Sequence, residues 1–342
     1  MSVPETMTAV LFTSDGEVRA DRVSVADPGP GEVLIRVAAV GICGTDLHLL
    51  RGDHVARDGD LVPGHEFSGR VAAIGPDVAG LAEGDLVAAD PNIPCRACAP
   101  CQRGRSNLCE NYEAVGVTRA GAAAEYVVVP AACCVVLSAG TEGRALEDLA
   151  LAEPLSCAVR GVDVVSPDLA DAVLIYGAGT MGMMMAELLA RSGASSVAVV
   201  DPNLAKLEHV RAVGASAVAA SVPELPGARQ EWDVVVDCTG VPAAIADGLD
   251  RVGRGGTFLQ FGVAATQATV EISPHRIYRD EISIVGSMAV LNSYSRAVSL
   301  MESAVVSAEP YVSHRLPLES YAEAIELFAA GATRKVLLTP GA

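Results

Sequence analysis

The chain has 342 residues, 51% of them hydrophobic and only 4% aromatic, which is enough for about two tightly packed α/β domains. Its formal net charge is −18, from 42 acidic and 24 basic residues, so the sequence excludes a broad basic surface for nucleic acid or acidic membranes. No run of about 18 apolar residues predicts a transmembrane helix, and the acidic start MSVPETMTAV lacks a signal-peptide pattern.

Residues 1–154 are predicted to form a β-rich, barrel-like domain. Short runs of Val, Ala and Ile, such as GEVLIRVAAVGICG and AAEYVVVPAACCVVL, are interrupted repeatedly by Gly and Pro. Turn signals at this frequency are typical of short strands joined by tight connections.

Candidate metal ligands are spread along this domain. Cys43 follows an apolar strand in VGICGTDLH, His65 and Glu66 lie in the turn PGHEFSG, and Glu153 lies in LAEPL. Each is a weak indication alone, because a Cys after a strand is usually a core residue and a His-Glu pair is usually on the surface. Together they offer ligands for a zinc ion that keeps a coordination position open for water or substrate.

A loop of four cysteines, CRACAPCQRGRSNLC, predicts a second and structural zinc site. Its spacing is C-x2-C-x2-C-x7-C, and four thiolates fill a tetrahedral coordination sphere. Disulfides fit a secreted chain, and a ferredoxin-type cluster has a shorter last gap followed by Pro, where this chain has Glu110. We therefore expect zinc in a lobe of about residues 90–112, held by Cys95, Cys98, Cys101 and Cys109.

Residues 155–289 are predicted to form a doubly wound parallel sheet of the Rossmann type. Strand-like runs such as AVLIYG, SVAVVD and WDVVVDCTG alternate with helical runs such as TMGMMMAELLARSG and NLAKLEHVRAVG. This alternation is the pattern of βαβ units. Residues 290–342 return to helix, loop and strand and end in AEAIELFAAGATRKVLLTP.

A dinucleotide-binding motif opens the second domain. The hexapeptide Gly177-Ala178-Gly179-Thr180-Met181-Gly182 follows an apolar strand and starts a helix. Its glycines permit a tight turn, close approach of a pyrophosphate and packing of helix on strand. Asp201 ends the next strand, where a carboxylate binds ribose hydroxyls and repels a 2′-phosphate, so NAD is favoured over NADP. The alternative is a glycine-rich turn without a ligand.

Together these motifs resemble those of the zinc-dependent medium-chain dehydrogenases, the family of alcohol and polyol dehydrogenases. The resemblance covers essentially the whole chain and includes GICGTDLH, VPGHEFSG, the cysteine loop, EPL, GAGTMG and KVLL. It implies a GroES-like barrel formed by residues 1–154 and completed by 290–342, with a Rossmann domain between them. It also implies two zinc ions per chain, one catalytic and one structural.

The resemblance further implies roles for single residues. Cys43 and His65 match catalytic-zinc ligands, and Glu66 and Glu153 match carboxylates that bind the ion directly or lie beside it. Asp46 matches the group that orients the histidine. Thr45 matches the hydroxyl that accepts the substrate proton, and His48 the end of the relay to solvent. Lys335 matches a basic residue that contacts the cofactor pyrophosphate.

The substrate is less narrowly defined. Glu-Pro-Leu at Glu153 and the sequence DPNIPC favour dehydrogenases of the sorbitol and arabinitol kind. The segment GSMAVLNSYSRA, however, has Ala289 where those enzymes have an arginine, and GAAAEY at Gly121–Tyr126 lacks their aromatic residue. An aminocyclitol, a smaller secondary alcohol and threonine-type 3-dehydrogenation therefore stay open as alternatives to a polyol.

Two rivals belong to other classes: a zinc-free quinone or enoyl reductase, and a non-catalytic dinucleotide-binding relative. Cys43, His65 and the cysteine lobe argue against the first, and Thr45 and His48 against the second.

The resemblance also implies a homodimer or homotetramer acting on a small alcohol or ketone. The remaining cysteines lie in apolar surroundings as free thiols, so we expect a soluble protein of the reducing cytoplasm: Cys133, Cys134, Cys157 and Cys238.

Overall fold

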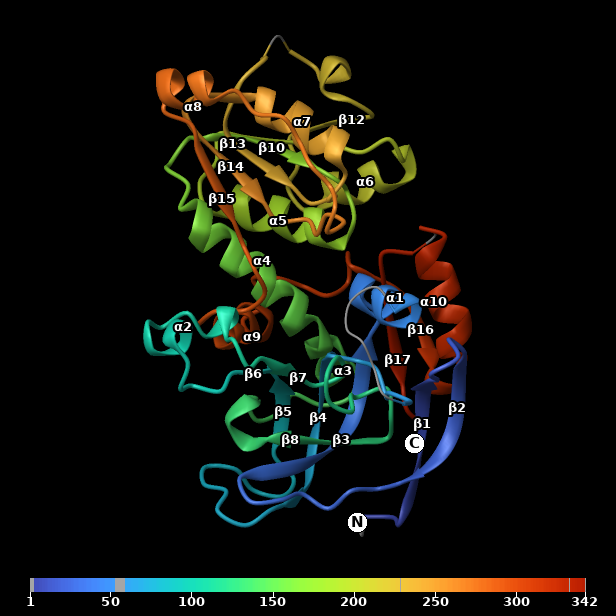
Figure 1. The fold of residues 1–342 in the computed structure, drawn as a ribbon. Coiled ribbons are helices and arrows are strands. Elements are labelled where there is room, and N and C mark those ends of the chain that lie inside the picture. Colours follow the sequence, from blue (N-terminus) through green and yellow to red (C-terminus); the bar gives the residue numbers. More distant parts are fainter. Residues whose placement is uncertain (1–2, 53–58, 228, 332, 342) are drawn as a thin grey trace. The chain divides into compact units, whose positions relative to one another are not determined.

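The chain divides into two compact units (Figure 1). The computed structural model describes residues 3–52, 59–227, 229–331 and 333–341. Unit 1 comprises Met1–Ser156 and Val290–Ala342, and unit 2 comprises Cys157–Ala289. The chain passes from one unit to the other within helix α4 (Ala152–Val165), two residues beyond the boundary predicted at residue 154.

Unit 1 is built on a sheet of order β16-β17-β3-β4-β5-β9, with β8 also paired to β3. The C-terminal strand β17 joins this sheet antiparallel to β3, with Leu337 opposite Gly41. Residues from both ends of the chain therefore share one sheet. The strands of unit 1 are β1 (Thr6–Phe12), β2 (Val18–Ser24), β3 (Glu32–Gly41), β4 (Glu66–Ile74), β5 (Leu86–Ala89), β6 (Asn92–Ile93), β7 (Glu113–Ala114), β8 (Tyr126–Pro130), β9 (Cys134–Val136), β16 (Val312–Pro317) and β17 (Lys335–Thr339).

The core of unit 1 lies where these strands meet helix α10 (Tyr321–Ala329). Phe12, Ile35, Phe67 and Tyr321 are at most 1% exposed, and the rings of Phe12 and Tyr321 meet edge to face with centroids 5.7 Å apart. Such burial of large apolar side chains is the main force that holds the sheet and helix together. The helices of unit 1 are α1 (Gly44–Arg51), α2 (Ala99–Gln102), α3 (Arg144–Asp148), α9 (Tyr294–Glu302) and α10 (Tyr321–Ala329), with short 3-10 turns η1 (Ser106–Leu108), η2 (Ala131–Cys133), η3 (Leu149–Leu151) and η5 (Leu318–Ser320).

Unit 2 is a parallel sheet of order β12-β11-β10-β13-β14-β15. Counted from β10, this is the doubly wound order 3-2-1-4-5-6 of a dinucleotide-binding fold. Every residue of β10 is buried, as expected for a parallel strand covered on both faces. The elements are β10 (Ala172–Tyr176), α5 (Thr180–Arg191), β11 (Ser196–Val200), α6 (Leu204–Ala212), β12 (Ala217–Ala219), η4 (Val222–Glu224), β13 (Trp232–Asp237), α7 (Pro242–Asp250), β14 (Val252–Gln260), α8 (Pro274–Asp280) and β15 (Ser283–Gly286).

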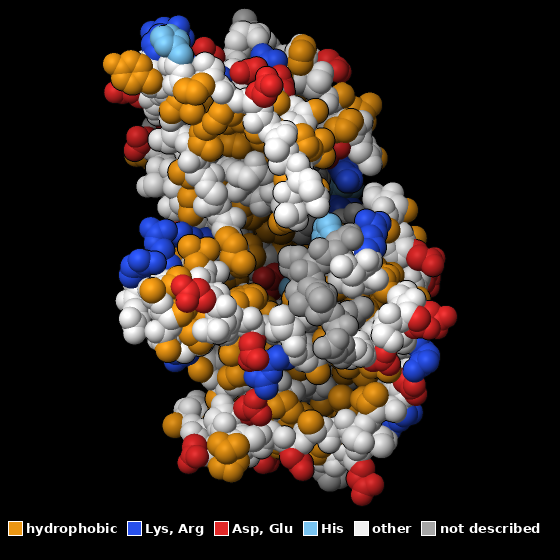
Figure 2. Space-filling view, viewed as in Figure 1, with side chains coloured by type: hydrophobic (Ala, Val, Ile, Leu, Met, Phe, Trp, Pro, Cys, Tyr) orange, Lys and Arg blue, Asp and Glu red, His pale blue; other side chains and the backbone are white. Residues whose placement is uncertain are grey.

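The surface and the helices agree with the composition. On the face shown in Figure 2, acidic side chains are scattered, and Lys and Arg lie in small separate groups. Among the described residues, every helix falls short of the length and apolar character that a membrane span needs.

Candidate metal centres and cofactor loop

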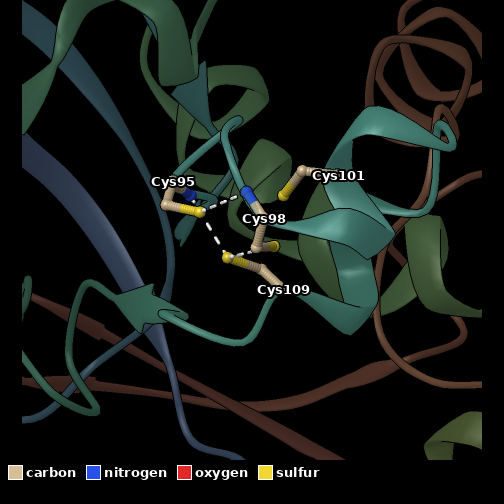
Figure 3. A group of neighbouring side chains, drawn as sticks. All are labelled: Cys95, Cys98, Cys101 and Cys109. Atoms are coloured by element: carbon tan, nitrogen blue, oxygen red, sulfur yellow. Dashed lines mark hydrogen bonds between the residues drawn. The ribbon is translucent and has the colours of Figure 1, made fainter.

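The four cysteines of the lobe converge on one point. Their sulfur atoms all lie within 4.8 Å of one another, and the side chains face a common centre (Figure 3). The sulfurs of Cys98 and Cys109 are 3.9 Å apart, close to the ~3.8 Å that a tetrahedral ion with Zn–S bonds of about 2.3 Å requires. The cluster therefore fits a four-coordinate zinc ion.

Backbone N–H groups prepare this cluster for a metal. The N–H of Cys95 donates to the sulfur of Cys109 at 3.2 Å, and the N–H of Cys98 donates to the sulfur of Cys95 at 3.4 Å. Hydrogen bonds from the N–H groups of Ala97 and Cys98 lower the pKa of Cys95 to about 6. At neutral pH that cysteine is mostly a thiolate, the form that binds zinc.

A second group of ligand atoms lies beside the main sheet of unit 1. Cys43 is the N-cap of α1, two residues after β3, and His65 and Glu66 lie where β4 begins. Gly41 pairs with Glu66, so the end of one strand faces the start of the other. The Cys43 sulfur, a His65 nitrogen and a Glu66 oxygen consequently lie within 4.8 Å of one another.

The electrostatics of this group suit a cation. Burial alone lowers the pKa of His65, but the adjacent Cys43 and then Asp46 and Glu153 raise it well above its usual value. This excess of negative charge around a buried imidazole is what a divalent ion neutralises. Thiolate, imidazole and carboxylate are also ligands that zinc accepts while leaving a position open.

Asp46 lies between Cys43 and His65 and faces both residues. Its Oδ2 accepts the N–H of Cys43 at 2.8 Å, and its Oδ1 lies 3.7 Å from Nδ1 of His65. The Asp46 side chain is fully buried, and neither Oδ1 nor the histidine Nδ1 has a hydrogen-bond partner among the described residues. Asp46 is thus placed where a small shift lets it orient His65.

Tyr321 contributes a further polar group beside Asp46, and it is not among the residues predicted from the sequence. The side chain is 1% exposed, and its hydroxyl has no hydrogen-bond partner within the described ranges. Burial and the charge of Asp46 raise the pKa of Tyr321 well above its usual value. A tyrosine at the start of an amphipathic helix has the sequence pattern of a core residue, so no local signal separates it from its neighbours.

Glu153 lies near this group without joining it. The three-ligand group contains Cys43, His65 and Glu66 and not Glu153. Glu153 is 8% exposed, and burial raises its pKa to about 7 despite the opposing charge of His65. It is therefore a carboxylate whose proton and charge respond to what binds beside His65.

Lys335 has a different partner from the one predicted. Its Nζ donates to both oxygens of Glu66, at 2.6 and 2.7 Å, and to the carbonyl of Ile42 at 2.9 Å. The residue is 3% exposed, and these bonds use the three hydrogens of its ammonium group. The geometry thus favours anchoring of Glu66 and gives no support to the predicted contact with the cofactor pyrophosphate.

Replacing Lys335 by Met should lower the free energy of unfolding by about 3 kcal/mol, because Glu66 then stays buried without its cation. Arg70 is the matched control, since its ion pair with Glu142 is open to solvent (45% and 71% exposed). Arg70→Met should cost less than about 1 kcal/mol. Denaturant unfolding of both variants measures the difference, and equal losses would contradict the role of the buried pair.

Thr45 and His48 lie on one face of α1. They are three residues apart, which makes them neighbours on a helix surface. The Thr45 hydroxyl oxygen lies 3.7 Å from the Cys43 sulfur, and Thr45 is half-buried whereas His48 is exposed. Thr45 therefore lies next to the Cys43 group, and His48 lies farther along the same helix face at the surface.

The glycine-rich loop of unit 2 has the geometry of a phosphate-binding turn. Gly177 has a φ of 99°, and a Cβ on Gly182 would lie 1.8 Å from the carbonyl oxygen of Gly177. A Cβ on Gly179 would meet nothing within 4 Å, so open space lies above the loop. The first turn of α5, with Thr180 and Met181, starts at Gly179 without a side-chain cap, and its N–H groups suit a pyrophosphate.

Asp201 stabilises this loop from the end of β11. Its Oδ2 accepts the N–H of Ala178 and its Oδ1 accepts the N–H of Asn203, both at 2.8 Å. The residue is 9% exposed. A carboxylate fixed beside the loop in this way is suited to ribose hydroxyls and unfavourable for a 2′-phosphate.

Family models and curated relatives cover this chain. The alcohol dehydrogenase GroES-like domain matches residues 29–139, and the glucose dehydrogenase C-terminus matches residues 149–334. D-arabinitol dehydrogenase 1 of Uromyces fabae is 34% identical over 99% of both chains. D-altritol 5-dehydrogenase of Agrobacterium fabrum is 35% identical over 91% of this chain and 93% of that one. An L-threonine 3-dehydrogenase of Caldanaerobacter subterraneus is 33% identical over 98% and 99%.

A solved structure has the same fold along its whole length. It is described as a zinc-binding dehydrogenase of Sinorhizobium meliloti bound to NADP, with 32% identity, a TM-score of 0.93, and coverage of 98% of this chain and 100% of that one. The match confirms the predicted combination of a GroES-like barrel and a Rossmann sheet.

Proposed function

Since the chain belongs to the zinc-dependent medium-chain dehydrogenase/reductase family, we propose that it transfers hydride between a polyol and a nicotinamide dinucleotide at the group formed by Cys43 and His65. Membership of this family of alcohol dehydrogenases sets aside the two rivals, a zinc-free reductase and a non-catalytic dinucleotide-binding protein. The observation that carries the proposal is the convergence of Cys43, His65 and Glu66 to within 4.8 Å.

We assign two zinc ions to each chain. The structural ion is held by the four lobe cysteines, and the catalytic ion is held by Cys43 and His65. Both oxygens of Glu66 already accept hydrogen bonds from Lys335, so we assign Glu66 to the surroundings of the ion and not to its ligands. Glu153 is then the carboxylate whose charge changes when the ion and the substrate bind. Metal analysis giving about two zinc ions per chain would support this assignment, and none would oppose it.

The chain's own residues handle the proton. Zinc, when bound, supplies a Lewis acid that lowers the pKa of an alcohol. The Thr45 hydroxyl accepts the substrate proton at Oγ1 while it passes its own proton on, and the exposed imidazole of His48 takes up a proton and releases it to solvent. Asp46 holds the Cys43 backbone and faces Nδ1 of His65, so it keeps the other ring nitrogen directed at the metal.

Unit 2 holds the cofactor. The dinucleotide, when bound, supplies the hydride acceptor. The N–H groups at Gly179, Thr180 and Met181 bind its pyrophosphate, and Asp201 accepts hydrogen bonds from the adenosine ribose. We propose NAD as the cofactor used, because the fixed carboxylate of Asp201 opposes a 2′-phosphate, although the related Sinorhizobium structure is bound to NADP.

Replacing Asp201 by Asn should narrow the preference for NAD over NADP about tenfold, because the repulsive charge is lost while the amide oxygen still accepts one of the two backbone hydrogen bonds. Asp201→Ala is the comparison, since it removes the hydrogen bonds to the N–H groups of both Ala178 and Asn203 and should raise KM for both cofactors. The ratio of kcat/KM for the two cofactors measures the effect. A ratio unchanged in Asp201→Asn would contradict the proposed selection.

A polyol is the proposed substrate class. It is supported by the arabinitol and altritol dehydrogenases among the relatives. The threonine 3-dehydrogenase is equally well covered but not more similar, so L-threonine is the second candidate, and an aminocyclitol is the third. A panel of pentitols, hexitols, aminocyclitols, L-threonine and short secondary alcohols, followed by absorbance of reduced cofactor, tests this order. Turnover of L-threonine alone would overturn it.

We propose a cytoplasmic homo-oligomer. Strand β15 lies at the edge of its sheet and pairs with β14 alone in the described part of the chain, and its Ile284 is 43% exposed. An edge strand with an apolar side chain is suited to pairing with a second copy. Light scattering after size exclusion separates a dimer or tetramer from a monomer.

A further inference from the structure

The carboxylate of Asp237 lies at the carboxyl end of β13 and is fully buried. Its Oδ1 accepts the N–H of Thr239 at 3.1 Å and the hydroxyl of Thr239 at 2.5 Å. Its Oδ2 accepts the N–H of Gly240 and an N–H of the Gln260 side-chain amide, both at 2.8 Å. These four bonds fill the acceptor sites of a carboxylate. Every donor is neutral, so hydrogen bonds from the adjoining loops stabilise this buried charge.

Asp237 holds two loops of unit 2 together. Its side chain binds Gly240 in the loop after β13, and Gly240 has a φ of 67°, which favours glycine. Its main-chain carbonyl accepts the N–H groups of Phe261 and Gly262, in the loop after β14, at 3.1 and 2.7 Å. A Cβ on Gly262 would lie 2.5 Å from the amide nitrogen of Gly240, so the two loops pack backbone against backbone.

The loop after β13 also borders the glycine-rich turn. A Cβ on Gly177 would lie 3.0 Å from Cγ2 of Thr239, so the methyl group of Thr239 packs against this turn. Strands β10 and β13 are neighbours, and the strand order reverses between them. A dinucleotide binds across the crevice at such a reversal, with one half over each set of strands. Asp201 follows β11 on the adenosine side, so the loop held by Asp237 lies on the side of the nicotinamide nucleotide.

We propose that Asp237 is a positioning residue for the dinucleotide: its hydrogen bonds to Thr239 and Gly240 hold the loop after β13 in the conformation that receives the nicotinamide half. Asp237 acts through this loop, because its own side chain is fully buried. The inference rests on the proposed function and adds a residue that acts on one half of the cofactor. A loop released from Asp237 gains conformations that binding must remove again, which weakens the affinity for the dinucleotide.

Calorimetric titration of the zinc-loaded protein with NAD and with AMP tests the proposal. AMP reaches only the adenosine side, so it reports on the half of the site that Asp237 does not shape. In Asp237→Asn, one acceptor oxygen is replaced by an amide group that faces other donors. The Kd for NAD should rise about tenfold while the Kd for AMP stays within about twofold.

Thr239→Val is the second variant and keeps the test informative if Asp237→Asn fails to fold. It removes the hydroxyl that donates to Asp237 and accepts the N–H of Val241 at 3.0 Å, but it keeps the methyl group at Gly177. The Kd for NAD should rise about threefold, and the Kd for AMP should stay unchanged.

Asp280→Asn is the matched control. Asp280 is 7% exposed and precedes β15, at the amino end of the same sheet. The variant should lower the melting temperature and leave the Kd for NAD within about twofold.

A Kd for NAD that stays unchanged in both Asp237→Asn and Thr239→Val, while the parent protein binds NAD and AMP, overturns the role of Asp237 alone. An equal rise in Kd for NAD and AMP overturns it as well, because the whole site is then loosened. A parent protein that binds neither ligand overturns the proposed cofactor site and the inference with it.

Discussion

Replacing Cys43 by Ser, or His65 by Ala, is expected to lower kcat by at least about a thousandfold. Each change removes a ligand from the group that lies within 4.8 Å, and loss of the Lewis acid raises the barrier by about 4 kcal/mol or more. Both residues lie in unit 1 and the glycine-rich loop lies in unit 2, so NAD binding should persist. Steady-state kinetics, metal analysis and calorimetric titration with NAD measure the three quantities.

Cys134→Ser is the control for this experiment. Cys134 is a half-buried thiol of unit 1 that belongs to neither ligand group of the described residues, and the variant should retain both zinc ions and kcat within about twofold. Full activity in a metal-free Cys43→Ser protein would overturn the catalytic site.

Replacing Cys98 by Ser is expected to lower stability by about 5 kcal/mol, among the largest effects of a single substitution. The four sulfurs converge on one centre, and zinc bound in a closed site contributes its binding energy to folding. Zinc content should fall from about two to about one per chain. Thermal unfolding and metal analysis of the purified protein measure both changes.

Cys134→Ser is again the control, because it shows how much stability is lost when a thiol outside the lobe is replaced and the lobe itself is unchanged. Protein that still folds after Cys98→Ser should retain a measurable chemical step, because neither Cys43 nor His65 has changed. An unaltered melting temperature together with a lost chemical step would mean that the structural and catalytic assignments are reversed.

Sites whose residues lie close together along the chain could be predicted from the sequence. The lobe cysteines span fifteen residues and the glycine motif six, so short-range geometry nearly fixes which atoms meet. Alternation of strand-like and helical runs predicted the parallel sheet of unit 2 for the same reason, since each run carries its own periodicity. The family resemblance, confirmed by the comparisons, added the position of Cys43, His65 and Asp46.

The sequence by itself therefore determined the fold class, the convergence of the four lobe cysteines and the glycine-rich turn of unit 2. Only the tertiary structure decided the partner of Lys335, which lies 269 residues from Glu66 along the chain, and the approach of Tyr321 to Asp46. Pairing of β17 with β3 brings the C-terminal residues to the end of the strand that precedes Cys43. Such contacts depend on long-range pairing of strands and on burial, which local patterns do not encode.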